Sequence, residues 1–493
     1  MKRFEKQGYW WLPSDPERRL PGMLVFGHDV DSELRLLGSM QEDFDALRMI
    51  GRGGDDFRPE IILGTSSDGK DYTLVYCLRN GFSMSAYVIE SFLPAVVIEG
   101  RHFASVETIV IQCATVRLSH LNGWLQSTGR QVTWEEAGEG RPTLRLTYRN
   151  PHDVTASCGS GRISLGLDGN IQFARFGGDF VVSEAACMSV FPDEPLHMNK
   201  FLEECLPPIT AFVSVGVGRP VSIHELRVKA AADCEGRTAD EQRAVPSIQL
   251  FWKKKRFKGE EKELFPHEMV FTCPELGDKL EEHLTQWVRG YEAIKPVMQL
   301  FFGRVITTET VSANSFLNAV QAAEAYHRYR RDGTEFPQSE HKARLTTILE
   351  ATPTEHRKWL KEKLCFSNEK SLGQRLTELL RERTDLLTIS HEETEAIAKR
   401  AKDLRNFFTH YSGEKKLPFG TADDFYVLGT LMRWIVIACF LEEMGFRREC
   451  AHELLDRCEP FRYFRSVHLK QQQVEFFRVE SVPASEIPKT ESD

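Results

Sequence analysis

The residues best suited to chemistry in this sequence are an arginine and a histidine, Arg405 and His410, with Asn406 beside the arginine. They stand at the end of a segment that we expect to be helical. Positions four apart share one face of a helix, so Asn406 and His410 would lie together, with Arg405 beside them. Histidine titrates near neutral pH and can give or take a proton. Arginine is always charged and can hold a phosphate group with two parallel hydrogen bonds.

Cleavage of RNA without a metal ion is a reaction that these groups fit. One group must remove the proton of the 2′-hydroxyl, another must protonate the leaving 5′-oxygen, and the charge on the phosphorane must be stabilised. His410 can transfer the proton and Arg405 can hold the phosphate. Asn406 would fix the histidine tautomer or bond a phosphate oxygen. One histidine does not easily serve both sides of a phosphate, so catalysis also predicts a homodimer with a two-fold axis.

The charge around this segment favours a polyanionic partner. The chain has 493 residues and a net charge of −9, which excludes binding of polyanions through bulk charge. Between residues 399 and 416, however, six basic residues oppose two acidic ones, which leaves a net charge of +4. We expect Arg400 and Lys402 in this window to contact RNA.

The arginine–histidine spacing is weak evidence by itself, because it occurs three times. The matches are Arg219/His224, Arg405/His410 and Arg447/His452. The first contains Pro220, so it cannot be helical, and the third follows Gly445 in a charged segment. The middle match alone combines a long expected helix, two phenylalanines and basic flanks. The residues alone still leave open a structural role, in which the arginine and histidine only cap the helix or form salt bridges.

The first half of the sequence predicts β-structure. We expect strands at 60–64, 72–77, 86–90, 95–99, 107–118, 143–148, 163–167, 171–176, 212–217 and 247–252. Tight turns are expected at 66–69 and at 168–170, where Asp-Gly tolerates positive φ. Many short strands with regular turn signals indicate a sandwich-like β domain, which we place at residues 1–260.

The second half predicts helices. Apolar positions recur at helical spacing in 276–291, 313–330, 340–351, 354–364, 372–387, 392–408 and 421–443. Short polar connections between them indicate an all-α helical bundle at residues 270–460. A C-terminal extension, 461–493, follows, with a tail that we expect to be disordered. A basic run at 253–258 joins the halves, either as a solvated connector or as a phosphate-contacting arm. The fold class is thus α+β, with two main domains.

The sequence predicts no cofactor, no metal site and no contact with a membrane. None of the 11 cysteines stands in a CxxC pair, and Cys450, His452 and Cys458 come nearest to a set of zinc ligands. No apolar run reaches the roughly 18 residues that a membrane helix needs. The N-terminus lacks an apolar signal segment. We therefore expect a cytoplasmic protein.

Several of these segments resemble a known family. The sequence Arg405-Asn-Phe-Phe-Thr-His410 resembles the Arg-x4–6-His signature of HEPN ribonucleases, including the polar residue after the arginine. Residues 316–329 are similar to the earlier helix of the HEPN domain in ApeA-type abortive-infection proteins. Residues 8–13 and 21–25 resemble the start of the ApeA N-terminal domain.

The resemblance implies a metal-independent endoribonuclease in antiphage defence. Arg405 and His410 would form a composite site in a homodimer or a higher homo-oligomer. Attack by the 2′-hydroxyl would give 2′,3′-cyclic phosphate and 5′-hydroxyl ends, with tRNA among the candidate substrates. Activity would be restrained until infection, when the β-rich domain senses a phage-encoded trigger. The alternative is a non-catalytic HEPN-like module for RNA binding or dimerisation.

A second polar group stands on the helix expected at 313–330. Glu324, His327 and Arg328 are within four residues of one another, so they occupy neighbouring positions of one helix. They are either a structural polar cluster, because buried polar groups are usually paired, or partners that support the active site.

Overall fold

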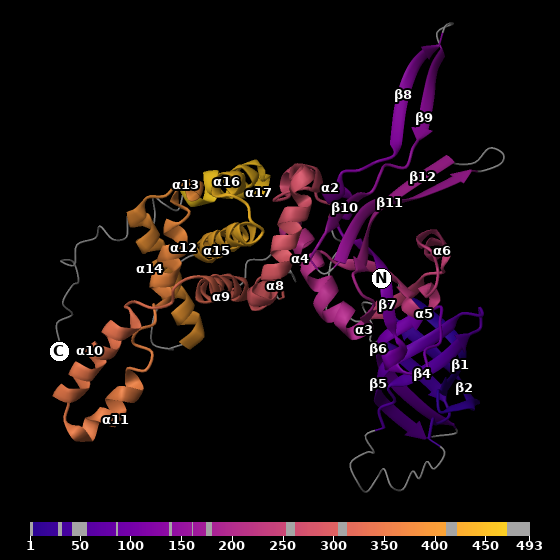
Figure 1. The fold of residues 1–493 in the computed structure, drawn as a ribbon, viewed down its shortest axis with the longest axis horizontal. Helices are drawn as coiled ribbons and strands as arrows, with labels where there is room; N and C mark the ends of the chain where they lie inside the picture. The colour runs from indigo at the N-terminus through magenta and orange to yellow at the C-terminus, as the bar shows by residue number, and fades with distance from the viewer. Residues whose placement is uncertain are drawn as a thin grey trace, which may run out of the picture. The chain divides into compact units, whose positions relative to one another are not determined.

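A computed structural model of the chain describes residues 3–27, 32–41, 57–84, 87–137, 141–159, 161–173, 180–252, 262–303, 313–410 and 422–470. The chain divides into two compact units (Figure 1). Unit 1 comprises Met1–Pro266 and Phe271–Val288, and unit 2 comprises His267–Val270 and Arg289–Asp493. All the named strands belong to unit 1, whereas the described elements of unit 2 are helical. The expected α+β fold class is confirmed.

Unit 1 contains a closed six-stranded barrel. Its strands are β1 (Phe4–Leu12), β2 (Asp15–Phe26), β3 (Glu33–Leu37), β4 (Ile61–Ser66), β5 (Asp71–Met84) and β6 (Val88–Glu99). They follow the order β6-β3-β2-β1-β4-β5, and β5 pairs with β6 to close the ring. The β-rich domain is therefore a barrel with an extension, rather than two sheets packed face to face. Closure leaves these six strands without a free edge, which protects them from pairing with other chains.

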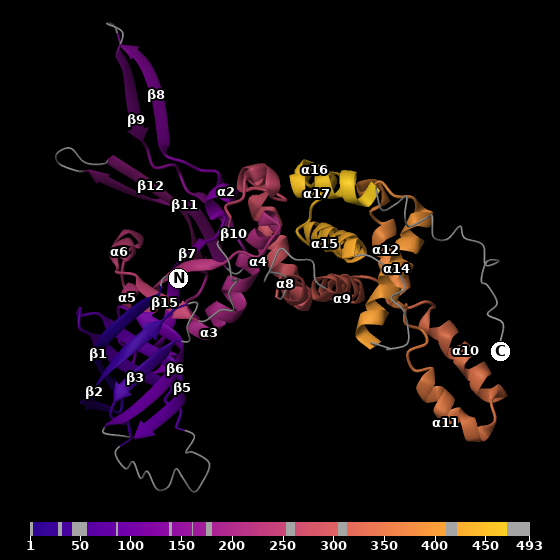
Figure 2. The same cartoon turned by 180° about the vertical axis from the view of Figure 1, so that it is seen from behind.

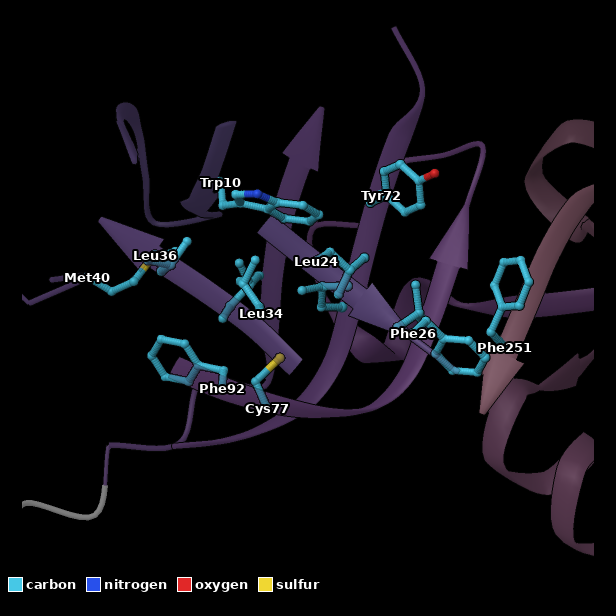
Figure 3. Close-up of a cluster of buried hydrophobic side chains, with 13 residues drawn as sticks. Trp10, Leu24, Phe26, Leu34, Leu36, Met40, Tyr72, Cys77, Phe92 and Phe251 are labelled. Atoms are coloured by element: carbon cyan, nitrogen blue, oxygen red, sulfur yellow. The ribbon is translucent and has the colours of Figure 1, made fainter. Parts of the chain in front are cut away.

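Large apolar side chains fill the barrel (Figure 3). The buried cluster consists of Trp10, Leu24, Phe26, Leu34, Leu36, Met40, Ile62, Tyr72, Leu74, Cys77, Phe92, Val97 and Phe251. Alternation along β1 turns Trp10 inward and leaves Tyr9 exposed. Gly64 of β4 lies directly against the Trp10 indole, where any Cβ would collide with the ring. Glycine at this position therefore makes room for the largest side chain of the core.

The same sheet continues beyond β6 in the order β15-β14-β7-β12-β11-β10. These strands are β7 (Val110–Leu118), β10 (Val154–Ser157), β11 (Gly161–Phe173), β12 (Phe180–Pro192), β14 (Ile223–Ala230) and β15 (Ile248–Trp252). The short β13 (Leu196–His197) pairs with β7. Two further strands, β8 (Arg130–Ala137) and β9 (Arg141–Tyr148), form a separate ribbon. Most of the strands expected from the sequence are confirmed.

The turn expected at 168–170 is wrong. Strand β11 runs straight through it and pairs Asp168 with Ala185 and Gly169 with Glu184 of β12. The Asp168 carboxylate accepts hydrogen bonds from arginines of β7 and β14. These partners come from distant parts of the chain, so a local turn signal gives no sign of them.

The strand expected at 212–217 is also wrong, because these residues end the helix α4 (Leu206–Val217). The helix has Pro207 and Pro208 in its first turn and ends at Gly218, which has a positive φ of 76°. Almost every α4 residue is buried, and a run that is apolar on all sides has no period that distinguishes a strand from a helix. The prolines at its start were the signal for a helix.

Shorter helices complete unit 1. They are α2 (Leu121–Leu125), α3 (Met198–Lys200), α5 (Ala231–Cys234), α6 (Ala239–Ala244) and α7 (Cys273–Leu276). The long helix α8 (Leu280–Phe302) begins in unit 1 and ends in unit 2. Its Trp287 is fully buried in unit 1, where the indole Nε1 donates to the carbonyl of Pro208 at 2.8 Å. The start of α8 is therefore part of the core of unit 1.

Unit 2 is a helical bundle, as expected. Beyond α8 its helices are α9 (Ala313–Arg330), α10 (Gln338–Ala351), α11 (Thr354–Lys363), α12 (Leu372–Arg381), α13 (Thr384–Leu387), α14 (His391–His410), α15 (Ala422–Glu443), α16 (Arg448–Arg457) and α17 (Glu459–Tyr463). The single helix expected at 372–387 is two helices, with a break at Glu382 and Arg383. Helix α16 was not predicted, because its sequence is mostly polar.

Helix α15 is the most apolar element of the bundle. Its segment from Phe425 to Glu443 is long and apolar enough to cross a membrane by length and composition, and it exceeds the apolar run expected from the sequence. However, 72% of the most apolar part of this segment is buried inside the structure. A buried apolar helix is what the core of a helical bundle requires. The basic run at 253–258, residues 411–421 and the tail from 471 onward lie outside the described residues.

Candidate active site on helix α14

Helix α14 carries all the residues singled out for catalysis and RNA contact. At its start, Ser390 and Glu393 form reciprocal hydrogen bonds between side chain and backbone, which satisfy free N–H groups of the first turn. Its apolar face is buried and consists of Ile397, Ala398, Ala401 and Leu404. The helix continues through His410, so Arg405, Asn406 and His410 stand in its last two turns.

This is the only one of the three arginine–histidine pairs that lies on a single helix. Arg219 follows the end of α4, and His224 belongs to strand β14. Arg447 precedes α16 with an extended backbone (φ −64°, ψ 152°), while His452 lies within that helix. The long helix expected for the middle pair is thus present, and its catalytic role stays a prediction.

The charge of Arg405 meets no carboxylate in the part of the chain that the structure describes. Its Nη1 donates to the Oδ1 of Asn406 at 3.2 Å. Its Nε is buried and has no acceptor among the described residues. Asn406 is a neutral amide, so it orients the guanidinium without cancelling its charge. A phosphate oxygen would supply both the missing charge and the missing acceptor.

Helix geometry groups Lys402 with Arg405 and separates Arg400 from it. At about 100° per residue, Lys402 lies roughly 60° from Arg405 around the axis, and Arg400 lies roughly 140° away. Position 410 falls on the Asn406 side, about 40° beyond it. The Lys402 Nζ is 3.6 Å from the Oδ1 of Asp403. Lys402 and Arg405 can thus face one phosphate backbone, whereas Arg400 would meet RNA on another side of the helix.

Phenylalanines fix the C-terminal part of α14 to the bundle. The ring of Phe408 lies 4.9 Å from that of Phe425 on α15, measured between centroids. Phe425 in turn lies 6.1 Å from Phe316 on α9. Edge-to-face contacts of this kind add to apolar burial. They hold the turn that carries Arg405 against two other helices.

Two family models match the chain. A model described as ApeA N-terminal domain 1 matches residues 5–287, and a model described as Apea-like HEPN matches residues 317–450. The first match alone covers more than half of the chain. The chain belongs to the ApeA family. Its N-terminal match ends one residue before the end of unit 1 at Val288. No curated protein and no solved structure gave a match.

The HEPN match contains both Arg405 and His410, together with most of α9 and the helices from α10 to α15. The resemblance seen in residues 405–410, 316–329 and 8–13 is thereby confirmed at the level of the family. In the described part of the ApeA-type chain, no three side chains of His, Cys, Asp or Glu lie close enough to hold a metal ion.

The HEPN domain also contains arginines of the opposite kind, which carboxylates surround. Arg383 is buried and contacts Glu442 and Glu382, with a backbone carbonyl and the Sγ of Cys439 as further acceptors. Arg331 bridges the same two glutamates, each at 2.9 Å. Hydrogen bonding to Glu382 raises the pKa of the Arg331 guanidinium above its ordinary value. This cluster joins α9, the start of α13 and α15.

The polar group on α9 belongs to a second structural cluster. Arg328 pairs with Glu324 at 3.1 Å and with Glu369 at 2.9 Å. His327 is fully buried, and its Nε2 lies 2.7 Å from the Oε2 of Glu378 on α12. These partners fasten α9 to α12 and to the segment before it. Of the two alternatives drawn from the sequence, the structural one is favoured.

Arg375 of α12 completes this cluster. Its Nη1 donates to the Nδ1 of His327 at 3.3 Å. Burial lowers the pKa of His327 in spite of the nearby Glu378 carboxylate. Because Arg375 can only donate, Nδ1 accepts from it, and a neutral imidazole carries its proton on Nε2, facing Glu378. Arg375 and Arg383 were missed from the sequence. The available signal was an arginine at an apolar position of the helical repeat, four residues before Leu379 in the case of Arg375.

Proposed function

We propose that this chain is an antiphage, abortive-infection endoribonuclease that cleaves RNA without a metal ion, in the cytoplasm. The observation that carries the proposal is Arg405, a cation without a carboxylate partner in the described structure, on the same helix as Asn406 and His410 and inside a HEPN domain. HEPN domains are generally ribonucleases. An uncompensated guanidinium in the same two helical turns as a histidine, a residue type that titrates near neutral pH, suits phosphate chemistry.

The reaction is an internal transfer. The 2′-oxygen of a ribose attacks the adjacent phosphorus, the bond from phosphorus to the 5′-oxygen breaks, and the products are a 2′,3′-cyclic phosphate and a 5′-hydroxyl. His410 acts as the general acid or base, and Arg405 donates to the non-bridging oxygens as negative charge grows on them. Asn406 holds the guanidinium in place. Lys402 and Arg400 contact the RNA backbone, and tRNA is one candidate substrate.

The site is composite and forms in a homodimer or a higher homo-oligomer. Two histidines on opposite sides of the phosphate can act as base and acid at once, and a two-fold axis near His410 supplies the second one. Mixing chains that carry Arg405→Ala with chains that carry His410→Ala tests this arrangement. Activity that stays proportional to chain concentration on dilution, in a protein that is monomeric by light scattering, would exclude a composite site.

The β-rich unit is the sensor or restraint. Its described strands carry no cluster of three potential metal ligands, and a large domain without chemistry of its own suits recognition of another molecule. A phage-encoded trigger binding there would release the HEPN domain. Full-length protein incubated with lysate from phage-infected cells should cleave RNA faster than protein incubated with lysate from uninfected cells.

An RNase assay in EDTA tests the catalytic assignment. The wild-type chain should release fragments that end in 2′,3′-cyclic phosphate, and Arg405→Ala and His410→Ala should each stop the reaction. Arg219→Ala and Arg447→Ala, from the two other arginine–histidine pairs, are the matched controls and should cleave normally. RNA binding without cleavage by the triggered wild-type chain would instead support a non-catalytic RNA-binding or dimerisation module.

A further inference from the structure

Helices α10 and α11 form a hairpin that contributes nothing to the core. The hairpin lies between α9 and α12 in the sequence, and neither of its helices has a buried residue. Figures 1 and 2 show this pair set apart from the other helices of unit 2. We call residues 338–366 the helical arm. A folded segment that buries none of its side chains has little reason to exist for stability.

The base of the helical arm is nevertheless firmly held. Thr334 and Glu369 form a β-bridge, and the N–H of Glu335 donates to the carbonyl of Asn368 at 2.9 Å. The side chain of Asn368 bonds both the N–H and the carbonyl of Phe336, each at 3.0 Å. The arm is therefore clamped across its two ends, and its orientation in unit 2 is specified.

The turn between the two helices of the arm is also fixed. The Nε of Arg357 donates to the carbonyl of Thr352 at 2.8 Å, and its Nη2 donates to the carbonyl of Glu350 at 3.1 Å. These are free carbonyls at the end of α10, which an arginine caps well. Specific contacts thus fix the shape of the arm, although neither of its helices has a buried residue.

The surface of α11 combines cations with an exposed aromatic ring. Trp359 is 60% exposed, and Lys358, Lys361 and Lys363 around it are exposed as well. At about 100° per residue, Lys363 lies roughly 40° from Trp359 on one side and Lys358 roughly 100° on the other, with Lys361 about 160° away. The exposed Glu355 and Glu362 lie between Trp359 and Lys358, roughly 40° and 60° from the indole. None of these three lysines forms an ion pair with the parts of the chain that the structure describes. Lys363 therefore stands beside an indole that is open to solvent, and Phe366, just beyond the helix, is 71% exposed.

The charge of the whole arm has the same sign. Residues 338–366 contain six basic and four acidic side chains, a net charge of +2 in a chain whose total is −9. One of the acidic ones, Glu340, lies beside a cation, Arg344, at 3.5 Å, whereas Glu355 lies 3.6 Å from His356, which is a cation only when protonated. The lysines of α11 and Lys342 of α10 form no ion pair with the described residues, so they are cations of the arm that remain available to an anion.

This combination is the chemistry of RNA binding. Lysine ammonium groups neutralise phosphates and release counterions, while an exposed indole stacks on an unpaired base. A protein-binding surface would look different, because the cores of protein interfaces are depleted in lysine. Apolar rings among unpaired lysines match a nucleic acid better than a protein.

The helical arm is followed in the chain by α12, which packs against α14. The clamped base of the arm is followed by Lys370, whose N–H donates to the carbonyl of Gly333 at 2.8 Å, and α12 begins two residues later at Leu372. A Cβ on Gly373, the second residue of α12, would lie 3.5 Å from the Cδ of Lys402. The side chain of Lys402 therefore rests against the start of α12, three residues before Arg405. An RNA strand held by the arm can continue onto the Lys402 side of α14.

We propose that the helical arm is a second RNA-binding site of the ribonuclease. Trp359 stacks on an unpaired base and Lys363 holds the adjacent phosphate. Lys358 and Lys361 hold phosphates farther along the strand as it passes around α11 and continues toward α14. This inference rests on the proposed function, because it concerns the RNA that the α14 site cleaves. It selects RNA with an unpaired stretch, such as a loop, over a continuous duplex.

Binding is measured on the full chain with His410→Ala, so that no RNA is cut, using a fluorescein-labelled oligouridine of about 20 nucleotides, longer than the site of one stacking platform. Replacing the three lysines with glutamine should lower the affinity about 10- to 100-fold at roughly 0.1 M salt and reduce the salt slope by about 2. Trp359→Ala should lower it about 5- to 100-fold.

Two control variants should leave the affinity unchanged. One replaces Lys200, Lys279 and Lys295 and so removes the same charge elsewhere. The other is Tyr329→Ala, which removes an exposed aromatic ring on α9.

Cleavage of a dinucleotide separates this inference from the proposed function. Cytidylyl-3′,5′-adenosine is too short to reach the arm, so arm variants of the otherwise wild-type, triggered enzyme should cleave it at the normal rate while losing activity on tRNA. Unchanged oligouridine affinity in the arm variants would overturn the arm proposal, even if the enzyme cleaves RNA. A change in oligomeric state without a change in RNA affinity would overturn it too, in favour of a protein partner. Failure of the wild-type chain to cleave any RNA would count against the α14 site alone.

Discussion

Two arginines of the HEPN domain, Arg383 and Arg405, show how differently the same side chain is used. Arg383 is buried between carboxylates and contacts Glu442 and Glu382. Arg405 is only half-buried, and the one hydrogen-bond partner of its guanidinium among the described residues is the neutral Asn406. Both lack an acceptor for Nε in the described structure, so the difference lies in charge compensation.

The difference indicates which cation is available for a ligand. An arginine whose charge is already matched holds helices together, and its removal weakens the pairing of the carboxylates around it. An arginine without a carboxylate costs stability in the free protein and gains a partner when an anion binds. Sites of function commonly carry such a local cost.

The largest effect is expected at Arg405 and His410. Arg405→Ala and His410→Ala should each reduce RNA cleavage at least about 1000-fold, because residues that act as a unit lose nearly all activity singly. The free energy of unfolding of Arg405→Ala should stay within about 0.5 kcal/mol of wild type, since no ion pair is broken. Initial rates on tRNA and urea unfolding curves measure the two quantities. A large loss of stability would show that Arg405 is structural, like Arg383.

Arg383→Ala should show the opposite result. Its removal leaves Arg331 as the shared cation of Glu442 and Glu382. We expect a loss of about 1–3 kcal/mol, below the value for fully buried pairs because Arg331 remains and both glutamates are partly exposed. Cleavage by the fraction that remains folded should be normal. Urea unfolding is the measurement, with the exposed Arg447→Ala as control. An unchanged midpoint would break the comparison between the two arginines.

Asn406→Asp would give Arg405 a carboxylate partner, as Arg383 has. The new carboxylate would pair with Arg405, cancel its charge and compete with the phosphate. We expect cleavage to fall about 10- to 100-fold, by analogy with the loss of one charge-stabilising donor. Asn406→Ala keeps the charge free and loses only its orientation, so it should cleave faster than Asn406→Asp. The reverse order of the two rates would contradict the view that the free charge of Arg405 matters.

The smallest effect concerns the pH dependence of stability at His327. Burial lowers the pKa of this imidazole, and Arg375, Glu378 and Lys370 surround it. The unfolded chain therefore binds a proton more readily than the folded one, and His327 should reduce stability as the pH falls below about 6.5. Thermal unfolding of wild type and His327→Gln between about pH 7.5 and 5.5, on both sides of the ordinary histidine pKa, measures this. As the pH falls, the melting temperature of wild type should decrease more than that of His327→Gln.

The sequence predicted the bundle more fully than the β-rich unit. Helices such as α9 and α14 carry their signals locally, in an apolar repeat and in residues that cap their ends, so their position could be foreseen. The family and the selection of Arg405 among three similar pairs also came from local context. Strand pairing depends on distant segments, and neither the closure of β5 onto β6 nor the course of β11 through Asp168 could be foreseen.

By itself the sequence determined the division into a β-rich and a helical half, the helix that carries Arg405, Asn406 and His410, and the membership of the family. The tertiary structure decided which charges are matched and which are free. Arg383 meets Glu442, 59 residues away, whereas Arg405 meets only its neighbour among the described residues. The structure likewise decided that Trp359 and its lysines stay exposed on an arm. Charge compensation and exposure depend on which distant segments pack together, and spacing along the chain does not encode that.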